Sequence, residues 1–335
     1  MTDTLQVQGE FAPAESSFAA ETLAAAVVAD AAADAVTAEP NGFIELGLAP
    51  ELVQAVADLG YTQPTSVQLK AIPLAMGSGN DSTSFIDLMV SSQTGSGKTA
   101  AFLLPVLHTL IQQQAAAETE ERAAFERAVA EAAARGEPAP KRAKRKDPTN
   151  SRNFKAATPG ALILCPTREL AQQVAHDAID LVKHCRGLRV ANVVGGMPYQ
   201  LQIAKLQNAN LVVATPGRLL DLQRSMQIKL DKVQFLVVDE ADRMLDLGFS
   251  DDLAELNQLT AQRKQTMMFS ATFAPRIQQL AMRVMHDGGA SVQKVTIDSP
   301  QEKHANIKQM LYWADNAQHK RKLLDHWLRD TSINQ

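Results

Sequence analysis

The stretch Ser92-Gln-Thr-Gly-Ser-Gly-Lys-Thr99 decides the fold. It follows an apolar run over residues 85–90 and precedes another over 100–104, which predicts a strand, a glycine-rich loop and a helix. In such a loop the backbone N–H groups at the helix start bind phosphate oxygens. The pattern G-x-x-x-x-G-K-[ST] is met except for Ser92 in place of its first Gly. The stretch therefore predicts nucleotide binding; the alternative is a Gly/Ser turn before a helix with a solvated Lys98.

Within the loop, Gly95 and Gly97 allow the backbone to approach a phosphate, where a Cβ atom would collide. Lys98 can reach the β- and γ-phosphates, and the Thr99 hydroxyl can bind Mg²⁺. We expect contacts to the nucleotide from the whole loop, namely Ser92, Gln93, Thr94, Gly95, Ser96, Gly97, Lys98 and Thr99.

Composition sets limits on the class of protein. The 335 residues are 45% hydrophobic and 21% charged, which is typical of a soluble protein. Two cysteines are too few for a disulfide framework or a metal cluster, and a reducing cytoplasm is expected. No apolar run reaches the ~18 residues of a membrane span. The net charge is −4, but residues 1–40 hold seven acidic and no basic residues, so the remainder carries −4 − (−7) = +3.

The chain divides into three predicted parts. Residues 1–40 are Ala-rich and acidic and predict a disordered tail. Residues 41–300 predict the folded domain, with a charged insertion at 115–158, and 301–335 predict a linker and the start of a second domain. The insertion contains the basic run Lys141-Arg-Ala-Lys-Arg-Lys146, which is either a solvated charge cluster or a contact for RNA or another polyanion.

Alternating apolar runs and helical patterns predict an α/β fold. The expected strands are 161–165, 190–194, 211–214, 235–238, 266–269 and 292–297, and the expected helices between them are 169–183, 199–207, 217–224, 253–259 and 275–285. We further expect the helix after the glycine-rich loop to end near Gln114, with a separate Ala/Glu/Arg helical pattern over 115–135 inside the insertion. This alternation predicts a mostly parallel sheet with helices on both faces. In such sheets ligands bind beyond the carboxyl ends of the strands.

One predicted strand ends in carboxylates, in the run Leu236-Val-Val-Asp239-Glu240-Ala-Asp242. Beside a phosphate-binding loop, Asp239 is placed to hold Mg²⁺ and Glu240 to orient or deprotonate the attacking water. Lys98, Asp239 and Glu240 are therefore the predicted catalytic residues, with Thr99 and Asp239 at the metal. The alternative is a helix with acidic residues in its first turn.

Three further strand ends predict contacts to a nucleic-acid backbone. Two of the loops place a Thr, a Pro and an Arg at a helix start, and the third contains two glycines. Helix starts, hydroxyls and guanidinium groups suit phosphodiester oxygens, although three capped helices would give the same pattern. The residues concerned are Pro166, Thr167, Arg168, Gly195, Gly196, Thr215, Pro216, Gly217 and Arg218. Next to them, Ser270 and Thr272 are expected to bond to Asp242 and to couple the two sites.

Taken in order, these motifs resemble the first RecA-like lobe of a DEAD-box RNA helicase, and the flanks are most similar to the bacterial RhlE-type branch. The resemblance runs from Phe43 to about Ile297. It implies a RecA-like fold, ATP and Mg²⁺ as cofactors, and RNA as partner. It also implies that Phe43, Tyr61 and Gln68 belong to a Q motif, with Phe43 packing on adenine and Gln68 bonding to its N6 and N7.

The resemblance leaves the activity of this chain open. The stretch after 301 resembles the opening of a second lobe, whose arginine finger has no match before Gln335. We expect an ATP-dependent RNA helicase lobe that is nearly inactive alone. The alternatives are a non-catalytic ATP- or RNA-binding module and a different P-loop motor acting on DNA or protein. We also expect a cytoplasmic monomer without membrane contact, with ribosome-assembly or RNA-decay proteins as possible partners.

Overall fold

We analysed a computed structural model that describes residues 41–77, 85–91, 95–138, 140–141, 155–297 and 312–329. The acidic tail over 1–40 and most of the basic run over 141–146 lie outside these residues. Within them, no helix combines the length and apolarity needed to span a membrane.

The described residues form a seven-stranded parallel sheet with the order β3-β4-β2-β5-β6-β1-β7. The strands are β1 Leu88–Ser91, β2 Ala161–Leu164, β3 Val190–Val193, β4 Leu211–Ala214, β5 Phe235–Val238, β6 Gln265–Ser270 and β7 Gln293–Thr296. Because every pair is parallel, the carboxyl ends of all strands lie at one edge, as the sequence predicts. The predicted α/β fold class, a parallel sheet with helices on both faces, is confirmed.

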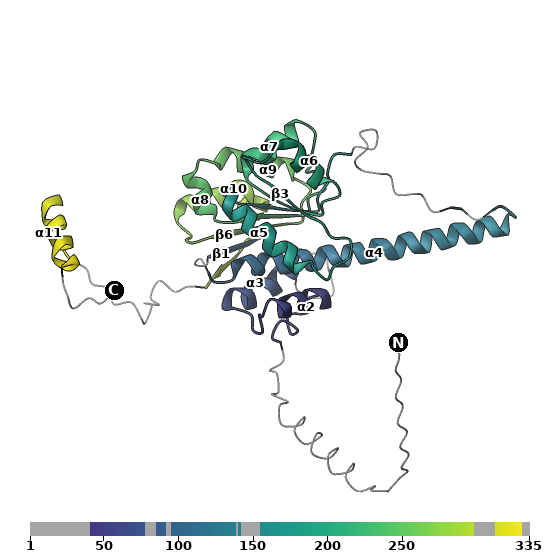
Figure 1. The fold of residues 1–335 in the computed structure, drawn as a ribbon, viewed down its shortest axis with the longest axis horizontal. Coiled ribbons are helices and arrows are strands. Elements are labelled where there is room, and N and C mark those ends of the chain that lie inside the picture. The colour runs from purple at the N-terminus through teal and green to yellow at the C-terminus, as the bar shows by residue number, and fades with distance from the viewer. Residues whose placement is uncertain are drawn as a thin grey trace, which may run out of the picture.

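Helices cover both faces of the sheet, and alternate strand residues belong to two separate cores. One core contains Val90, Ile163 and Val237 with α2 Pro50–Asp58, α3 Ser66–Met76, α4 Lys98–Ala134 and α5 Arg168–Leu181. The other contains Leu164 and Val238 with α6 Tyr199–Leu206, α7 Pro216–Arg224, α8 Ala241–Asp246, α9 Ser250–Leu259 and α10 Pro275–Val284. Figure 1 shows these two layers.

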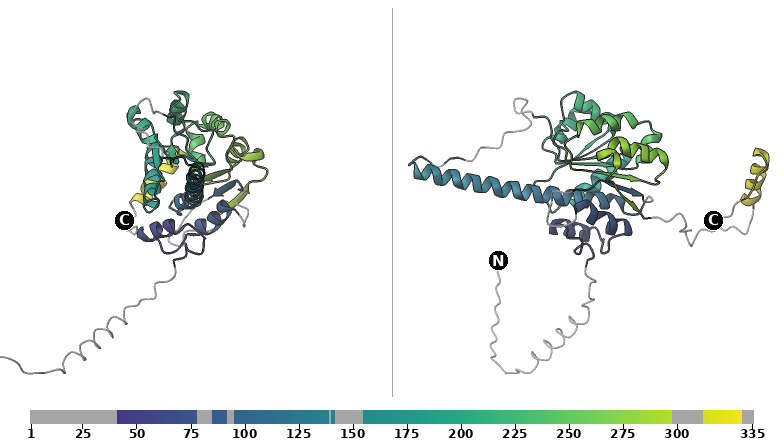
Figure 2. Two further views of the ribbon diagram at one scale, coloured as in Figure 1. Left: turned by 90° about the vertical axis from the view of Figure 1, so that its right-hand side faces the viewer. Right: turned by 180° about the vertical axis from the view of Figure 1, so that it is seen from behind.

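The helix after the glycine-rich loop is longer than predicted. We expected it to end near Gln114, with a separate helical pattern over 115–135 in an insertion. The helical pattern is confirmed, but α4 runs through both parts without a break to Ala134 and spans 37 residues. Figures 1 and 2 show its distal half projecting away from the sheet. The Ala, Glu and Arg residues of this half have high helix propensity, so the helix continues without a core to pack against.

Two short elements complete the chain. The 3₁₀ turn η2 His286–Gly289 joins α10 to β7. Helix α11 Ala317–Leu328 lies within the stretch expected to open a second domain, and it has no buried residue.

Candidate nucleotide and nucleic-acid site

The carboxyl edge of the sheet brings Lys98 to the acidic cluster. The Nζ atom of Lys98, in the first turn of α4, lies 3.3 Å from Oδ1 of Asp239 and 3.5 Å from Oε1 of Glu240, which follow β5. Strand β6 separates β1 from β5, and the long Lys98 side chain crosses that distance. All three predicted catalytic residues therefore meet at one point.

Asp239 is fully buried, at 0% exposure. Burial raises the pKa of its carboxyl above the ordinary value, although the positive charge of Lys98 opposes this rise. Cys165 directly follows β2, whose last residue, Leu164, accepts a bond from Asp239 N. Burial together with the charge of Asp239 raises the pKa of this thiol well above its usual range. A buried carboxylate of this kind is costly unless it binds a cation.

Glu240 is held in an unusual backbone conformation. Its φ of 49° and ψ of 53° are left-handed, a region that costs a non-glycine residue about 1–3 kcal/mol. Its backbone N–H donates to Oδ1 of Asp239 at 2.9 Å, and Arg243 lies 3.4 Å from its carboxylate. This backbone conformation places both carboxylates at the strand end.

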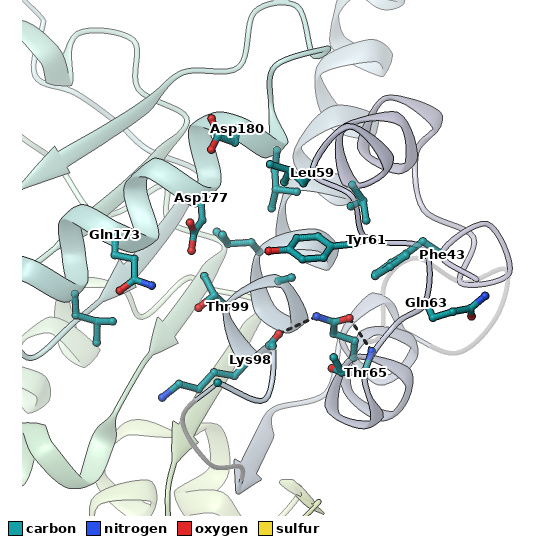
Figure 3. A pocket seen from close by; sticks show the side chains of 18 of the residues that line it. Phe43, Leu59, Tyr61, Gln63, Thr65, Lys98, Thr99, Gln173, Asp177 and Asp180 are labelled. Atoms are coloured by element: carbon teal, nitrogen blue, oxygen red, sulfur yellow. Dashed lines mark hydrogen bonds between the residues drawn. The ribbon is translucent and has the colours of Figure 1, made fainter. Parts of the chain in front are cut away.

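A pocket of about 510 Å³ opens beside Lys98. Its lining comes from five places: Phe43, the stretch 56–68 that runs from α2 into α3, the glycine-rich loop with the first turns of α4, helix α5, and Glu240. Figure 3 shows Gln173 and Asp177 on one side, Tyr61 and Phe43 on the other, and Thr99 between them. Burial raises the pKa of the Asp177 carboxyl in this wall.

The Gln68 side chain ties the glycine-rich loop to α3. Its Oε1 accepts a bond from the N–H of Thr65 at 2.9 Å, and its Nε2 donates to the carbonyl of Gly97 at 3.0 Å. Gly97 has a φ of 87°, and a Cβ there would lie 2.6 Å from Nε2 of Gln68. We expected the Gln68 amide to face a base, and the structure shows it bonded within the protein. One N–H and one oxygen lone pair remain for a ligand.

The two predicted aromatic residues differ in exposure. Phe43 is 1% exposed and packs in the core, but it also lines the pocket, so a small part of its ring is open to a base. Tyr61 is 56% exposed and lines the pocket, so it offers the larger free ring surface. Ser92, Gln93 and Thr94 lie outside the described residues.

Two buried polar atoms fit a phosphate and a metal ion. Oδ2 of Asp239 and Oγ of Ser96 have no hydrogen-bond partner among the described residues. Such atoms normally have a partner, and Mg²⁺ and phosphate oxygens would provide it. Groups of three or more His, Cys, Asp or Glu side chains that could hold a metal do not occur in the described part.

The first predicted backbone-contacting loop lies against the glycine pair. Thr167 caps α5, because its Oγ1 accepts a bond from Leu170 N at 3.3 Å. The Arg168 side chain is 51% exposed, and a Cβ on Gly196 would lie 2.7 Å from its Nη1 atom. Pro166 is buried behind them. Arg168 and Gly196, 28 positions apart in sequence, are therefore neighbours.

The second loop approaches the glycine pair from α7. Thr215 donates its N–H to the carbonyl of Val193 at 3.1 Å, and its side chain makes no capping bond. Pro216 and Gly217 form the first turn of α7. The Arg218 side chain is only 20% exposed, and its Nη1 donates to the carbonyl of Met197 at 3.2 Å. All three predicted loops thus meet at one edge.

The predicted coupling bonds are absent. None of the hydrogen bonds among the described residues joins Ser270 or Thr272 to Asp242. Ser270 is 2% exposed and its hydroxyl has no partner in the described part, whereas Thr272 is exposed. The expectation was wrong for this conformation, because the Ser270 hydroxyl is buried without a partner among the described residues and Thr272 bonds to no residue on α8.

Sequence reasoning missed one residue at this edge. Gln202, in α6, is fully buried and donates to the carbonyls of Val194 and Met197 at 2.9 and 3.1 Å. It lies four residues before the buried Leu206, on the core-facing side of the helix. That i, i+4 spacing is the only signal in the sequence, and a Gln there is usually a surface residue.

Comparison with known proteins gives these motifs a family. A model of the DEAD/DEAH box helicase family matches residues 65–280. The chain belongs to the DEAD/DEAH box helicase family. It is 34% identical to the ATP-dependent RNA helicase SrmB of Haemophilus influenzae over 293 residues, which cover 87% of this chain and 55% of that protein. The chain spans about half the length of the curated relatives it matches.

Solved DEAD-box structures agree with the fold. A DEAD box protein from Methanococcus jannaschii is 29% identical, with a TM-score of 0.56, covering 86% of this chain and 63% of that one. Dbp5 of S. cerevisiae bound to RNA and ADP BeF3 is 28% identical, with a TM-score of 0.55, covering 77% and 52%. The sequence-based resemblance to the DEAD-box RNA helicase family and the predicted RecA-like fold are thereby confirmed.

Proposed function

We propose that this chain is the ATP-binding lobe of a DEAD-box ATP-dependent RNA helicase. Lys98 lies between two carboxylates at the end of β5, beside a pocket that reaches Tyr61 and Gln68, and this observation carries the proposal. The lobe binds ATP with Mg²⁺ in this pocket and holds an RNA backbone along the neighbouring strand ends. With a second lobe it hydrolyses ATP and separates short duplexes.

The residues divide the work by their chemistry. Loop N–H groups and Lys98 hold the phosphates, while Thr99 and Asp239 hold Mg²⁺, which neutralises charge on the phosphates. Glu240 orients the attacking water and takes its proton. Tyr61 stacks on the base, and the free N–H and lone pair of Gln68 read the N7 and N6 edge of adenine.

RNA contacts come from the three loops at the same edge. Arg168 offers an exposed guanidinium, and Gly195, Gly196, Thr215 and Gly217 offer backbone and hydroxyl groups. Pro166, Thr167, Pro216 and Arg218 shape these loops. Such groups bind phosphate and sugar and carry little sequence information.

No arginine lines the pocket in the described part of the chain. An arginine finger contributes ~10³–10⁵ to the rate in well-studied NTPases. We therefore propose that a second lobe supplies it and that this chain alone turns over very slowly. Several expectations stay predictions. They are the RhlE-type branch, the role of the 115–158 insertion, the cytoplasmic location, the monomeric state, and contacts with ribosome-assembly or RNA-decay proteins.

The test measures ATP hydrolysis by two proteins: this chain alone, and this chain joined to the second half of a relative. Each protein is assayed with RNA, with DNA of the same sequence, and without nucleic acid. We expect RNA-specific stimulation in the joined protein only. ATP binding without hydrolysis in either form would favour the non-catalytic module. Equal stimulation by DNA would favour a different P-loop motor.

A further inference from the structure

The turn around Gly195 and Gly196 is held at both ends by one buried side chain. Nε2 of Gln202 donates to the carbonyl of Val194, before the two glycines, and to the carbonyl of Met197, after them, at 2.9 and 3.1 Å. Gln202 is 0% exposed, so no water competes for these bonds. A single amide group therefore fixes the two ends of a four-residue segment.

A second side chain binds the same turn from α7. Nη1 of Arg218 donates to the carbonyl of Met197 at 3.2 Å, and its guanidinium lies 5.8 Å from the centre of the Tyr199 ring. Asp221 lies 3.9 Å from Nε of the same group. Because these contacts engage the guanidinium, Arg218 acts on the turn more directly than on a ligand in solvent.

These bonds leave the glycine amides free. Among the hydrogen bonds of the described residues, none uses the N–H of Gly195 or of Gly196. Gly196 is exposed, has a φ of 79° and lies against Arg168. Successive free N–H groups beside a guanidinium suit a phosphate oxygen.

The bonding of Gln202 has a cost to stability. Its Oε1 atom is buried and has no partner within the described residues. A buried acceptor without a partner destabilises the folded state, and an apolar side chain of similar length would avoid this loss. A Gln is therefore better explained by its two bonds to the turn than by packing.

We propose that Gln202 is a positioning residue for RNA binding, which holds the Gly195–Gly196 turn in the shape that presents its N–H groups beside Arg168. The inference rests on the proposed RNA-binding function. A turn ordered in advance binds more tightly, because the RNA does not have to order it. Gln202 itself touches no RNA.

The chain offers a matched control. Gln265 is also buried, at 1% exposure, and its Nε2 also donates to two carbonyls, those of Ala75 at 3.2 Å and Ile86 at 2.8 Å. It begins β6 and so lies at the opposite edge of the sheet. Gln202→Met and Gln265→Met remove the same donor from equally buried places.

The experiment titrates the full 335-residue chain with a uridine dodecamer over a series of salt concentrations, starting at low salt and followed by NMR. We expect Gln202→Met to weaken RNA binding about tenfold, which corresponds to about 1.4 kcal/mol. The slope of log affinity against log salt should not change, because no phosphate contact is lost. Gln265→Met should bind RNA as the unaltered chain does, and both variants should keep their affinity for Mg²⁺-ADP.

A second readout needs no RNA. In Gln202→Met the NMR order parameters of the Gly195 and Gly196 amides should fall from the ~0.85 of rigid backbone to below ~0.6, and in Gln265→Met they should not. Unchanged order parameters, or unchanged RNA affinity in Gln202→Met, would overturn the inference. A reduced salt slope would show direct contact and would also overturn it. Failure of the unaltered chain to bind RNA would instead overturn the proposed function.

Discussion

The Nζ atom of Lys98 lies 3.3 Å from Oδ1 of Asp239, a carboxylate with no exposed surface. The first residue of the helix after β1 thus supplies the positive charge for the strand end of β5. Bound phosphates and Mg²⁺ would divide this pair, with the lysine turning to the phosphates and the carboxylate to the metal.

Replacing Lys98 tests this division. Lys98→Ala removes a charge-assisted bond to phosphate worth about 1.5–3 kcal/mol, so Mg²⁺-ADP affinity should fall roughly 10- to 100-fold. Lys183→Ala is the control, because that lysine is 64% exposed and pairs with Asp58 away from the glycine-rich loop. Calorimetric titration of both variants with Mg²⁺-ADP checks the prediction. If Lys98→Ala bound Mg²⁺-ADP as tightly as Lys183→Ala, Lys98 would not be a phosphate ligand.

Replacing Asp239 by Asn should make the nucleotide-free chain more stable. It should also abolish the Mg²⁺ dependence of nucleotide binding. Burial raises the native pKa of this carboxyl, so the native state binds the proton more tightly than the unfolded state. Its charge therefore costs stability as pH rises above 3.8, the ordinary value. The gain in unfolding free energy of Asp239→Asn should be absent below that pH, grow above it, and level off above the raised native pKa. Denaturant unfolding at a series of pH values measures this gain. A lower unfolding free energy of Asp239→Asn than of the unaltered chain at pH 7 would contradict the account of Asp239 as a buried charge that needs a cation.

Glu240 should act on turnover and not on binding. Glu240→Gln keeps the shape of the side chain but loses the basic carboxylate, so ATP should bind as before and hydrolysis should fall at least ~100-fold. Single-turnover hydrolysis of labelled ATP over hours detects this even in a slow enzyme. An unaltered rate would exclude Glu240 as the group that activates water.

Arg168 should bind RNA phosphate directly. Arg168→Ala should weaken binding to the same extent for all RNA sequences and should lower the salt slope by about 1. Arg283→Ala is the control, because this arginine is equally exposed, at 50%, and lies at the end of α10, paired with Asp251. An effect confined to one RNA sequence would indicate base recognition instead.

The sheet was largely predictable because its strands are short, continuous apolar runs. The bounds predicted for β4 and β5 match the structure, since every residue from Leu211 to Ala214 and from Phe235 to Val238 is buried. Continuity of α4 past Gln114 was not predictable, because residues there have helix propensity but no apolar stripe to mark a boundary.

The positions of site residues at the strand ends were predictable from the sequence. The hydrogen-bond partners of their side chains were not. The sequence placed Lys98 and Asp239 at one edge, but not the bond from Gln68 to Gly97 or the buried orientation of the Ser270 hydroxyl. Gln202 was missed because burial of a polar side chain depends on what packs over its helix.

The measurement that tests the central claim most directly is calorimetric titration of the chain with Mg²⁺-ADP and Mg²⁺-GDP, repeated with Gln68→Ala. The free N–H and lone pair of Gln68 match N7 and N6–H of adenine, whereas guanine presents an oxygen where adenine has its amino group. We predict tighter binding of ADP by about tenfold or more, which corresponds to about 1.4 kcal/mol, and a smaller preference in Gln68→Ala. Equal affinities for ADP and GDP, or no binding of either, would contradict the account.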